Sequence, residues 1–204
     1  RCRIVTGVQT CALPILHEVI LVDGHSSDGT VDVARQVRPG IRVIAQEGRG
    51  KGAALRSGFA HARGDIIVTL DADGSTDPGE IPAFLGVLLA GADYVKGSRF
   101  LQGGGTADMS RMRRLGNWGF VRAVRFLFGG AYTDLCYGYN AFWADVLPAL
   151  DPDCDGFEVE TLMNVRALRA GLRVAEVPSF EAKRMYGSGR LRPLRDGWRV
   201  VRTV

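Results

Sequence analysis

The chain has 204 residues, of which 46% are hydrophobic and 24% are charged, with a formal charge of +4 and a pI of about 9.1. This size predicts one globular domain with at most a short appendage. No apolar run reaches the roughly 18 residues that a membrane-spanning helix needs, so we expect a soluble or peripheral protein. The four cysteines form no Cys-x-x-Cys pair and the three histidines are scattered, which argues against a zinc site or a disulfide framework.

The first sixteen residues show no clear two-residue or 3.6-residue period. The stretch from Thr6 to Ile15 resembles a translated sequencing-adapter junction. We therefore expect residues 1–16 to be a non-native leader that takes no part in the fold. A genuine irregular leader is the alternative.

From residue 17 onward, apolar strand patterns alternate with helical patterns. Strands are predicted at 18–22, 41–45, 66–70 and 93–99, and helices at 31–37, 52–62, 77–89 and 110–128. This alternation is typical of an α/β domain with a mostly parallel sheet and flanking helices.

The strand predicted at 66–70 runs directly into two carboxylates, Asp71 and Asp73, with one residue between them. Open α/β sheets bind ligands at the carboxyl ends of their strands. A hard divalent cation prefers carboxylate oxygens together with substrate phosphates. The pair predicts either a metal clamp for a diphosphate or two caps of a turn before Gly74.

Two other loops follow strands. The loop from Asp23 to Thr30 consists of small, hydrogen-bonding residues, which suit a base or ribose, although Asp28 is also suited to capping the next helix. The loop from Glu47 to Ala54 carries three alternating glycines and Lys51 before a helix, which suits a phosphate or sugar.

Basic residues form two helical stripes with a tryptophan at each edge. On the helix predicted at 110–128 the stripe comprises Arg111, Arg114, Trp118, Arg122 and Arg125, and in the last segment it comprises Arg192, Arg195, Trp198, Arg199 and Arg202. These stripes favour an anionic membrane surface, and two solvated helix faces are the alternative.

The order of these motifs resembles the inverting family 2 glycosyltransferases of the GT-A fold, and more closely the polyprenyl-phosphate (dolichyl-phosphate-type) sugar synthase branch. The matching segments are Asp23 to Thr30, Gly50-Lys51-Gly52, Asp71-x-Asp73, Gly97-Ser98-Arg99, Thr133 to Phe142, Phe157 to Thr161, Glu176-Val177-Pro178 and Arg184 to Leu191. The resemblance covers about residues 17–204.

The resemblance implies a Rossmann-like GT-A domain over residues 17–191, followed by the start of a basic helix at 192–204. The family's first strand, which ends in Pro-x-x-Asn-Glu, has no counterpart here, and residues 1–16 stand in its place. Because that strand is central in the family's sheet, we expect unpaired backbone on its two neighbours and an N-terminally truncated chain that is inactive or folds poorly.

The resemblance also implies an activity: inverting transfer of a sugar from GDP-mannose or a UDP-hexose to a polyprenyl phosphate, dependent on Mg²⁺ or Mn²⁺. The implied donor-binding residues are Asp23, Ser26, Asp28, Lys51, Gly52, Asp71 and Ala72. The implied metal ligands are Asp71 and Asp73, and the implied catalytic residues are Asp73 and Arg99. The implied acceptor-phosphate contacts are Arg99, Arg184, Ser188 and Arg190.

Two positions depart from the family pattern, and two acidic residues have two possible roles. Ser75 stands where relatives often have Gln or His, and Asn140 stands where Arg is usual. Glu158 and Glu160 either position groups near the acceptor or are ordinary acids at a helix start.

We expect the protein on the cytoplasmic membrane face, bound peripherally, with no nucleic-acid partner. The alternatives are an inactive, truncated glycosyltransferase fragment, a sugar-phosphate nucleotidyltransferase, and a nucleic-acid-binding module suggested by the high pI. The second would place its Gly-rich loop directly after the first strand, and the third has no supporting motif here.

Overall fold

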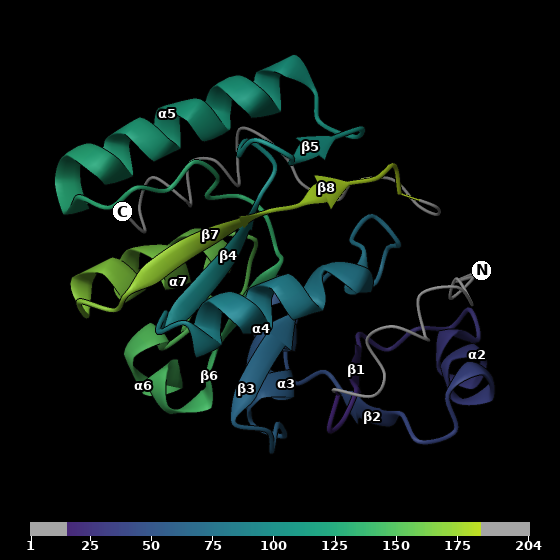
Figure 1. Cartoon of the computed structure of the whole chain (residues 1–204). Coiled ribbons are helices and arrows are strands. Elements are labelled where there is room, and N and C mark those ends of the chain that lie inside the picture. Colours follow the sequence, from purple (N-terminus) through teal and green to yellow (C-terminus); the bar gives the residue numbers. More distant parts are fainter. Residues whose placement is uncertain (1–15, 185–204) are drawn as a thin grey trace.

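The computed structural model describes residues 16–184 (Figure 1). The predicted leader, apart from Leu16, and the predicted basic helix at 192–204 lie outside the described residues. Ser188 and Arg190 also lie outside them. Within residues 16–184, no helix is both long enough and apolar enough to cross a bilayer.

The predicted elements between residues 18 and 128 are confirmed, with ends displaced by up to four residues. The strands are β1 (Ile20–Asp23), β2 (Arg42–Ala45), β3 (Ile66–Thr69), β4 (Tyr94–Ser98), β5 (Gly105–Thr106), β6 (Asn140–Trp143), β7 (Val174–Pro178) and β8 (Phe180–Glu181). The helices are α2 (Thr30–Val37), α3 (Lys51–Phe59), α4 (Ile81–Leu89), α5 (Arg111–Phe128), α6 (Leu147–Leu150) and α7 (Val159–Arg169), with short 3-10 turns η2 (Pro78–Glu80) and η3 (Ala144–Val146). The predicted helix at 77–89 is divided, because Asp77 caps η2 by accepting a hydrogen bond from the Gly79 amide and α4 begins only at Ile81.

The main sheet has the strand order β3-β6-β4-β7. β4 and β7 are parallel, whereas β6 runs antiparallel to both β3 and β4. β1 and β2 form a separate parallel pair, and no ladder joins that pair to β3 in the described part of the chain. The fold is therefore α/β with a mixed sheet.

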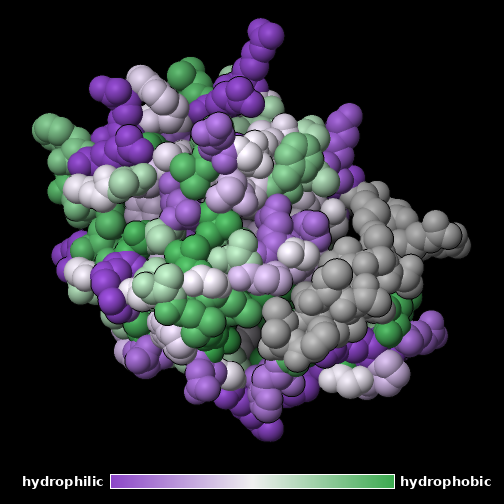
Figure 2. All heavy atoms as spheres, viewed as in Figure 1, coloured by the Kyte–Doolittle hydropathy of each residue, from purple (hydrophilic) through white to green (hydrophobic). Residues whose placement is uncertain are grey.

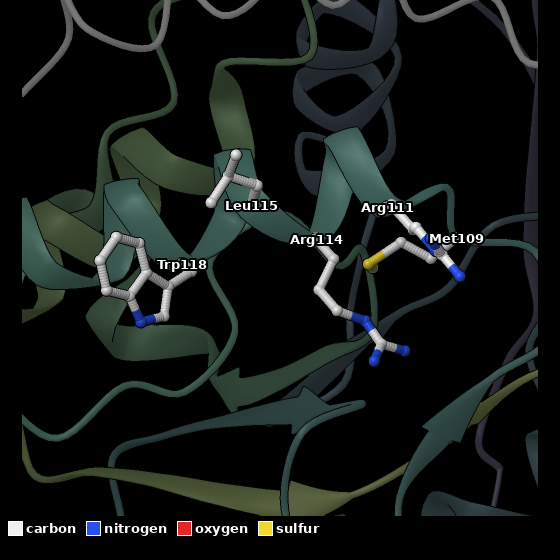
Figure 3. A pocket seen from close by; sticks show the side chains of 5 residues that line it. All are labelled: Met109, Arg111, Arg114, Leu115 and Trp118. Atoms are coloured by element: carbon white, nitrogen blue, oxygen red, sulfur yellow. The ribbon is translucent and has the colours of Figure 1, made fainter.

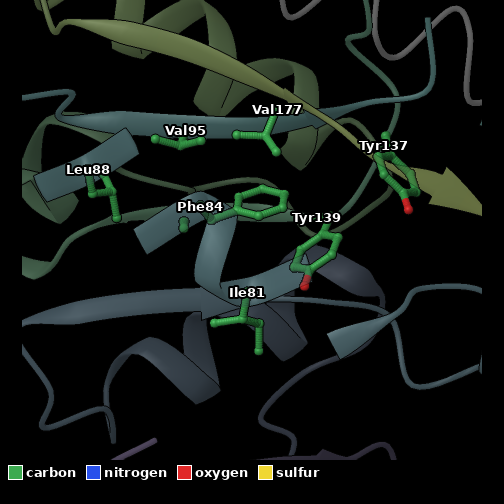
Figure 4. Close-up of a cluster of buried hydrophobic side chains, with 8 residues drawn as sticks. Ile81, Phe84, Leu88, Val95, Tyr137, Tyr139 and Val177 are labelled. Carbon is green, nitrogen blue, oxygen red and sulfur yellow. The ribbon is translucent and has the colours of Figure 1, made fainter. Parts of the chain in front are cut away.

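Helices cover both faces of the main sheet. On one face, α4 packs Ile81, Phe84 and Leu88 against side chains of β4, β6 and β7, and Figure 4 shows this cluster. The stacked rings of Phe84 and Tyr139 lie 4.3 Å apart within it. On the other face, α3, α6 and α7 pack against side chains of β3, β4 and β6, among them Tyr94 of β4. This division follows from the alternation of side chains along a strand.

Candidate active site

The directions of the strands bring three chain segments to one edge of the sheet. β3 and β4 both run antiparallel to β6, so they are parallel to each other, and β7 is parallel to β4. Their carboxyl ends lead to Asp71, Arg99 and the segment 179–184 respectively. This edge is where an α/β sheet binds ligands.

Lys51, the first residue of α3, forms ion pairs with two carboxylates at this edge. Its Nζ lies 2.7 Å from Asp71 Oδ1 and also contacts Glu160 Oε1, from the first turn of α7. A Cβ placed on Gly138 would lie 2.6 Å from both Lys51 Nζ and Glu160 Oε1. Only glycine therefore lets the backbone approach these three charged groups so closely.

The charges of these groups support one another. Partial burial raises the pKa of the Asp71 carboxyl, but the adjacent Lys51 ammonium and the more distant Arg184 outweigh burial and hold that pKa below its usual range. Burial lowers the pKa of Lys51, yet Glu160 and Asp71 together raise it above its ordinary value. Lys51 is thus a permanent cation at neutral pH.

Asp73 divides its two carboxylate oxygens between different partners. Oδ1 accepts hydrogen bonds from the amide and the hydroxyl of Ser75, at 3.0 and 2.6 Å. Oδ2 lies 3.2 Å from Arg184 Nε, which is also 3.3 Å from Asp108 Oδ2. The Ala182 amide donates to the Ser75 carbonyl at 2.8 Å, which holds Arg184 beside the aspartates. Asp108 had no sequence signal that marked it as part of the site.

The donor set fits a divalent cation that arrives with its substrate. Four carboxylates and two cations gather here, a net charge of −2: Asp71, Asp73, Asp108, Glu160, Lys51 and Arg184. Among the described residues no three His, Cys, Asp or Glu side chains are grouped closely enough to hold a metal by themselves. A cation at Asp71 and Asp73 would therefore need further oxygen ligands from water or a bound ligand to complete its shell.

Arg99 is buried behind this edge. Its guanidinium donates to both oxygens of Asp134, at 2.7 and 2.9 Å, and to Glu181 Oε2 at 3.0 Å. It also donates to the Cys136 carbonyl and lies over the Tyr137 ring. Contact with an acceptor phosphate, as predicted, would require the phosphate to reach a guanidinium whose side chain is only 1% exposed.

The predicted donor residues near β1 are held by their own loop. The half-buried Asp23 accepts a hydrogen bond from the Ser26 amide at 3.2 Å. The exposed Asp28 accepts from the hydroxyl and the amide of Thr30, and these bonds lower the pKa of Asp28. Asp28 therefore bonds within its own turn but does not cap α2, whose N-cap is Gly29 without a side-chain hydrogen bond. Ala72 is exposed between the two acids.

The glycines before α3 are explained by close backbone packing. The Gly52 amide donates to the Asp155 carbonyl at 2.8 Å, so this amide is not offered to a donor phosphate. A Cβ on Gly52 would lie 1.9 Å from the Cys154 carbonyl oxygen, and one on Gly50 would lie 2.2 Å from that of Asp155. Gly50 also has φ +103°, which other residues rarely adopt. These glycines place Lys51 by fitting α3 against the loop at 154–156.

Solved structures define the class of protein to which this fold belongs. A glucosyl-3-phosphoglycerate synthase from Mycobacterium tuberculosis, solved in complex with Mn²⁺, UDP-glucose and phosphoglyceric acid, superposes with a TM-score of 0.71 and 27% identity. The match covers 96% of this chain and 71% of that one. The fold is that of the GT-A glycosyltransferases.

The sequence comparisons narrow this class to one family. A model described as Glycosyl transferase family 2 matches residues 11–150, and the chain belongs to this family. The match begins at residue 11, inside the segment 1–16 that is expected to be a non-native leader.

Curated relatives match most of the chain. Glycosyltransferase AglJ of Haloferax volcanii is 35% identical over 181 residues, which cover 88% of this chain and 59% of the relative. The undecaprenyl-phosphate mannosyltransferase of Micrococcus luteus is 33% identical over 85% of this chain and 75% of the relative. The polyprenol monophosphomannose synthase of Mycolicibacterium smegmatis is 31% identical over 92% of this chain and 75% of the relative. The chain thus spans about three fifths of AglJ and three quarters of the other two.

Proposed function

We propose that this glycosyltransferase moves one sugar from a nucleotide diphosphosugar to a polyprenyl phosphate, with inversion at the anomeric carbon. The observation that carries the proposal is the contact between Asp73, expected on the donor side, and Arg184, expected on the acceptor side. The names of the mannosyltransferase relatives support the acceptor class.

On the donor side, Asp71 and Asp73 would hold a divalent cation, Mg²⁺ or Mn²⁺, which when bound neutralises charge on the departing diphosphate. The Mn²⁺ in the structural relative supports this assignment. Lys51 adds a fixed positive charge beside Asp71. The Asp23 loop is proposed to contact the nucleotide, because it follows a parallel strand at its carboxyl end.

On the acceptor side, the nucleophile is a phosphate oxygen. A phosphate monoester has its second pKa at about 6, so this oxygen is already anionic at neutral pH and needs no strong general base. It must instead be held and partly neutralised, a role that we assign to Arg184. We keep Arg99, Ser188 and Arg190 as proposed acceptor contacts. In the described structure, Arg99 also fixes Asp134 and Glu181.

The surface of α5 is proposed to bind an anionic membrane peripherally. The predicted stripe is exposed along its whole length, and exposed apolar side chains accompany it: Met112, Leu115, Trp118, Phe126 and Leu127. Apolar and polar residues are intermixed at the top of the molecule in Figure 2, where Figure 1 places α5. An open pocket of about 560 Å³ lies along the start of α5, lined by Met109, Arg111, Arg114, Leu115 and Trp118 (Figure 3). These exposed apolar side chains beside the arginines support membrane binding over a solvated helix face.

A transfer assay with two acceptor classes tests the reaction. The purified chain is incubated with labelled GDP-mannose or UDP-glucose, Mg²⁺ or Mn²⁺, and either a short polyprenyl phosphate or phosphoglyceric acid. We expect a labelled polyprenyl-phosphate sugar that disappears when the metal is chelated. Asp73→Asn should lower kcat at least a hundredfold, whereas Asp77→Asn, which changes the cap of η2, should leave kcat within a few-fold.

Two outcomes would overturn the proposal. Transfer to phosphoglyceric acid alone would replace the lipid acceptor with a small phosphorylated one. No transfer to either acceptor by a folded chain would favour the inactive-fragment alternative.

A further inference from the structure

Lys51 lies between two carboxylates, and only one of them, Asp71, belongs to the proposed metal clamp. We propose that Glu160 is a positioning residue that retains Lys51 when a divalent cation displaces this ammonium from Asp71. The inference rests on the proposed metal site and deepens it. In the metal-free protein the Lys51 ammonium contacts both Asp71 and Glu160. In the metal-bound protein it contacts Glu160 alone.

The three groups come from distant parts of the chain and meet at one point. Lys51 begins α3, Asp71 follows β3, and Glu160 is the second residue of α7. The Gly138 backbone lies beside this cluster, because a Cβ there would come 2.6 Å from both Lys51 Nζ and Glu160 Oε1. A shift of the ammonium away from Asp71 leaves it on Glu160.

Electrostatics supplies the driving force for the exchange. Asp71 Oδ1 already contacts an ammonium, so a divalent cation at the same carboxylate is repelled by Lys51 at short range. Glu160 is 7% exposed, and a buried carboxylate is costly unless it stays paired. Transfer of Lys51 to Glu160 relieves the repulsion and keeps Glu160 neutralised. It also leaves a positive charge beside the position proposed for the donor diphosphate.

Metal binding by the donor-free protein tests the exchange without any turnover. Mn²⁺ affinity is measured by electron paramagnetic resonance in Lys51→Met, Glu160→Gln and the double variant. We expect Lys51→Met to bind Mn²⁺ about five- to tenfold more tightly, because the competing cation is gone. Glu160→Gln should bind it more weakly by a similar factor, because Lys51 then depends on Asp71 alone.

The double variant separates exchange from a simple field effect. If Glu160 acts by receiving Lys51, Glu160→Gln should change the Mn²⁺ affinity less than twofold once Lys51 is absent. An equal loss in both backgrounds would show a through-space effect and overturn the proposal. Glu158→Gln is the matched control, since Glu158 is also buried near the start of α7 but bonds to the Gly156 amide.

Lysine ammonium NMR gives a second readout that uses the unmodified chain. The sequence contains three lysines, Lys51, Lys96 and Lys183. Mg²⁺ should shift the Lys51 signal and leave that of Lys96, which is buried against the Tyr137 carbonyl and Asn140, as an internal reference. In Glu160→Gln, Mg²⁺ should broaden the Lys51 signal as the ammonium loses its last carboxylate. A Lys51 signal unchanged at saturating Mg²⁺ would overturn the exchange.

Asp71→Asn and Asp73→Asn distinguish failure of this inference from failure of the proposed function. Unchanged Mn²⁺ affinity in both variants would contradict the proposed metal site itself. If these variants lose Mn²⁺ binding, but the Lys51 and Glu160 substitutions change the Mn²⁺ affinity independently of each other, only the proposed exchange is contradicted.

Discussion

At the scale of single residues, the site depends on a position with no side chain. Gly138 lies against the Lys51, Asp71 and Glu160 cluster, and a methyl group there would come within 2.6 Å of two charged atoms. Lys51 is flexible, but it is held by two ion pairs, so the methyl group can be accommodated only by separating them. The role of this glycine is steric.

We therefore expect Gly138→Ala to lower the free energy of unfolding by about 1–3 kcal/mol, the usual cost of overpacking, and to weaken Mn²⁺ and nucleotide binding at least tenfold. Urea melts and calorimetric titration measure the two effects. Gly86→Ala is the control, because a Cβ at this position in α4 meets nothing within 4 Å. That change should stabilise the chain by about 0.5–1 kcal/mol. Unchanged binding in Gly138→Ala would contradict the steric role.

The two described cysteines give a pH-dependent prediction. Burial, and then nearby carboxylates, raise the pKa of Cys136 and of Cys154 to about 11. Only the thiolate reacts with iodoacetamide, so both thiols should be alkylated slowly at pH 8 and faster as the pH approaches 11. A thiol pKa raised above its unfolded value contributes stability that is present below about pH 9 and is lost as pH rises through about 11.

Mass spectrometry after timed alkylation measures this, in a background with Cys2→Ser and Cys11→Ser. The same protein in urea should react readily at pH 9. A native alkylation rate that already levels off near pH 8 would contradict the raised pKa values.

At the scale of elements, two buried ion pairs of Arg99 join the end of β4 to two other segments. Arg99 follows β4 and binds Asp134 and Glu181, and its side chain is 1% exposed. Removing one member of such a pair leaves an uncompensated buried charge. We expect Arg99→Met to lower the free energy of unfolding by about 3–5 kcal/mol, measured by urea denaturation.

Arg173→Met is the matched comparison, because it breaks an exposed pair with Asp93 that adjoins the other end of β4. It should move the urea midpoint far less than Arg99→Met does. Equal shifts for the two variants would show that burial of the Arg99 pair is not what makes it important.

The α5 surface gives a prediction about vesicle binding. Each basic residue near an anionic membrane contributes about 1 kcal/mol, so Arg111→Gln with Arg114→Gln should weaken binding to phosphatidylserine vesicles by about thirtyfold. Arg35→Gln with Arg63→Gln removes the same charge from exposed positions outside α5 and should have little effect. Liposome flotation measures both, and equal binding of the native chain to neutral vesicles would count against the arginines.

At the scale of the whole molecule, helices support the four-stranded sheet more fully than they support the β1–β2 pair, and β5 and β8 form a third, two-stranded sheet. The four-stranded sheet is covered by helices on both faces, whereas β1 and β2 form only a two-stranded pair backed by α3. Two-stranded units are marginally stable by themselves. We propose that β1 and β2 open more readily than the main sheet.

Native-state hydrogen exchange should show amides of β1 and β2 exchanging at least a hundredfold faster than those of β4 and β6. Comparable protection in both sheets, with a single cooperative urea transition and full turnover, would contradict this view and the prediction of a poorly folded chain.

The sequence by itself determined the strands β1 to β4, the helices α2 to α5 apart from the start of α4, the acids after β3, and the family. These features depend on neighbouring residues and on the order of short motifs, which the chain displays directly. Only the tertiary structure decided that β6 runs antiparallel, that Arg99 is buried by Asp134, that the Gly52 amide belongs to Asp155, and that Lys51 is shared by Asp71 and Glu160. Such partners lie 20 to 109 residues apart, and their meeting is set by how the helices pack on the sheet, which no local pattern encodes.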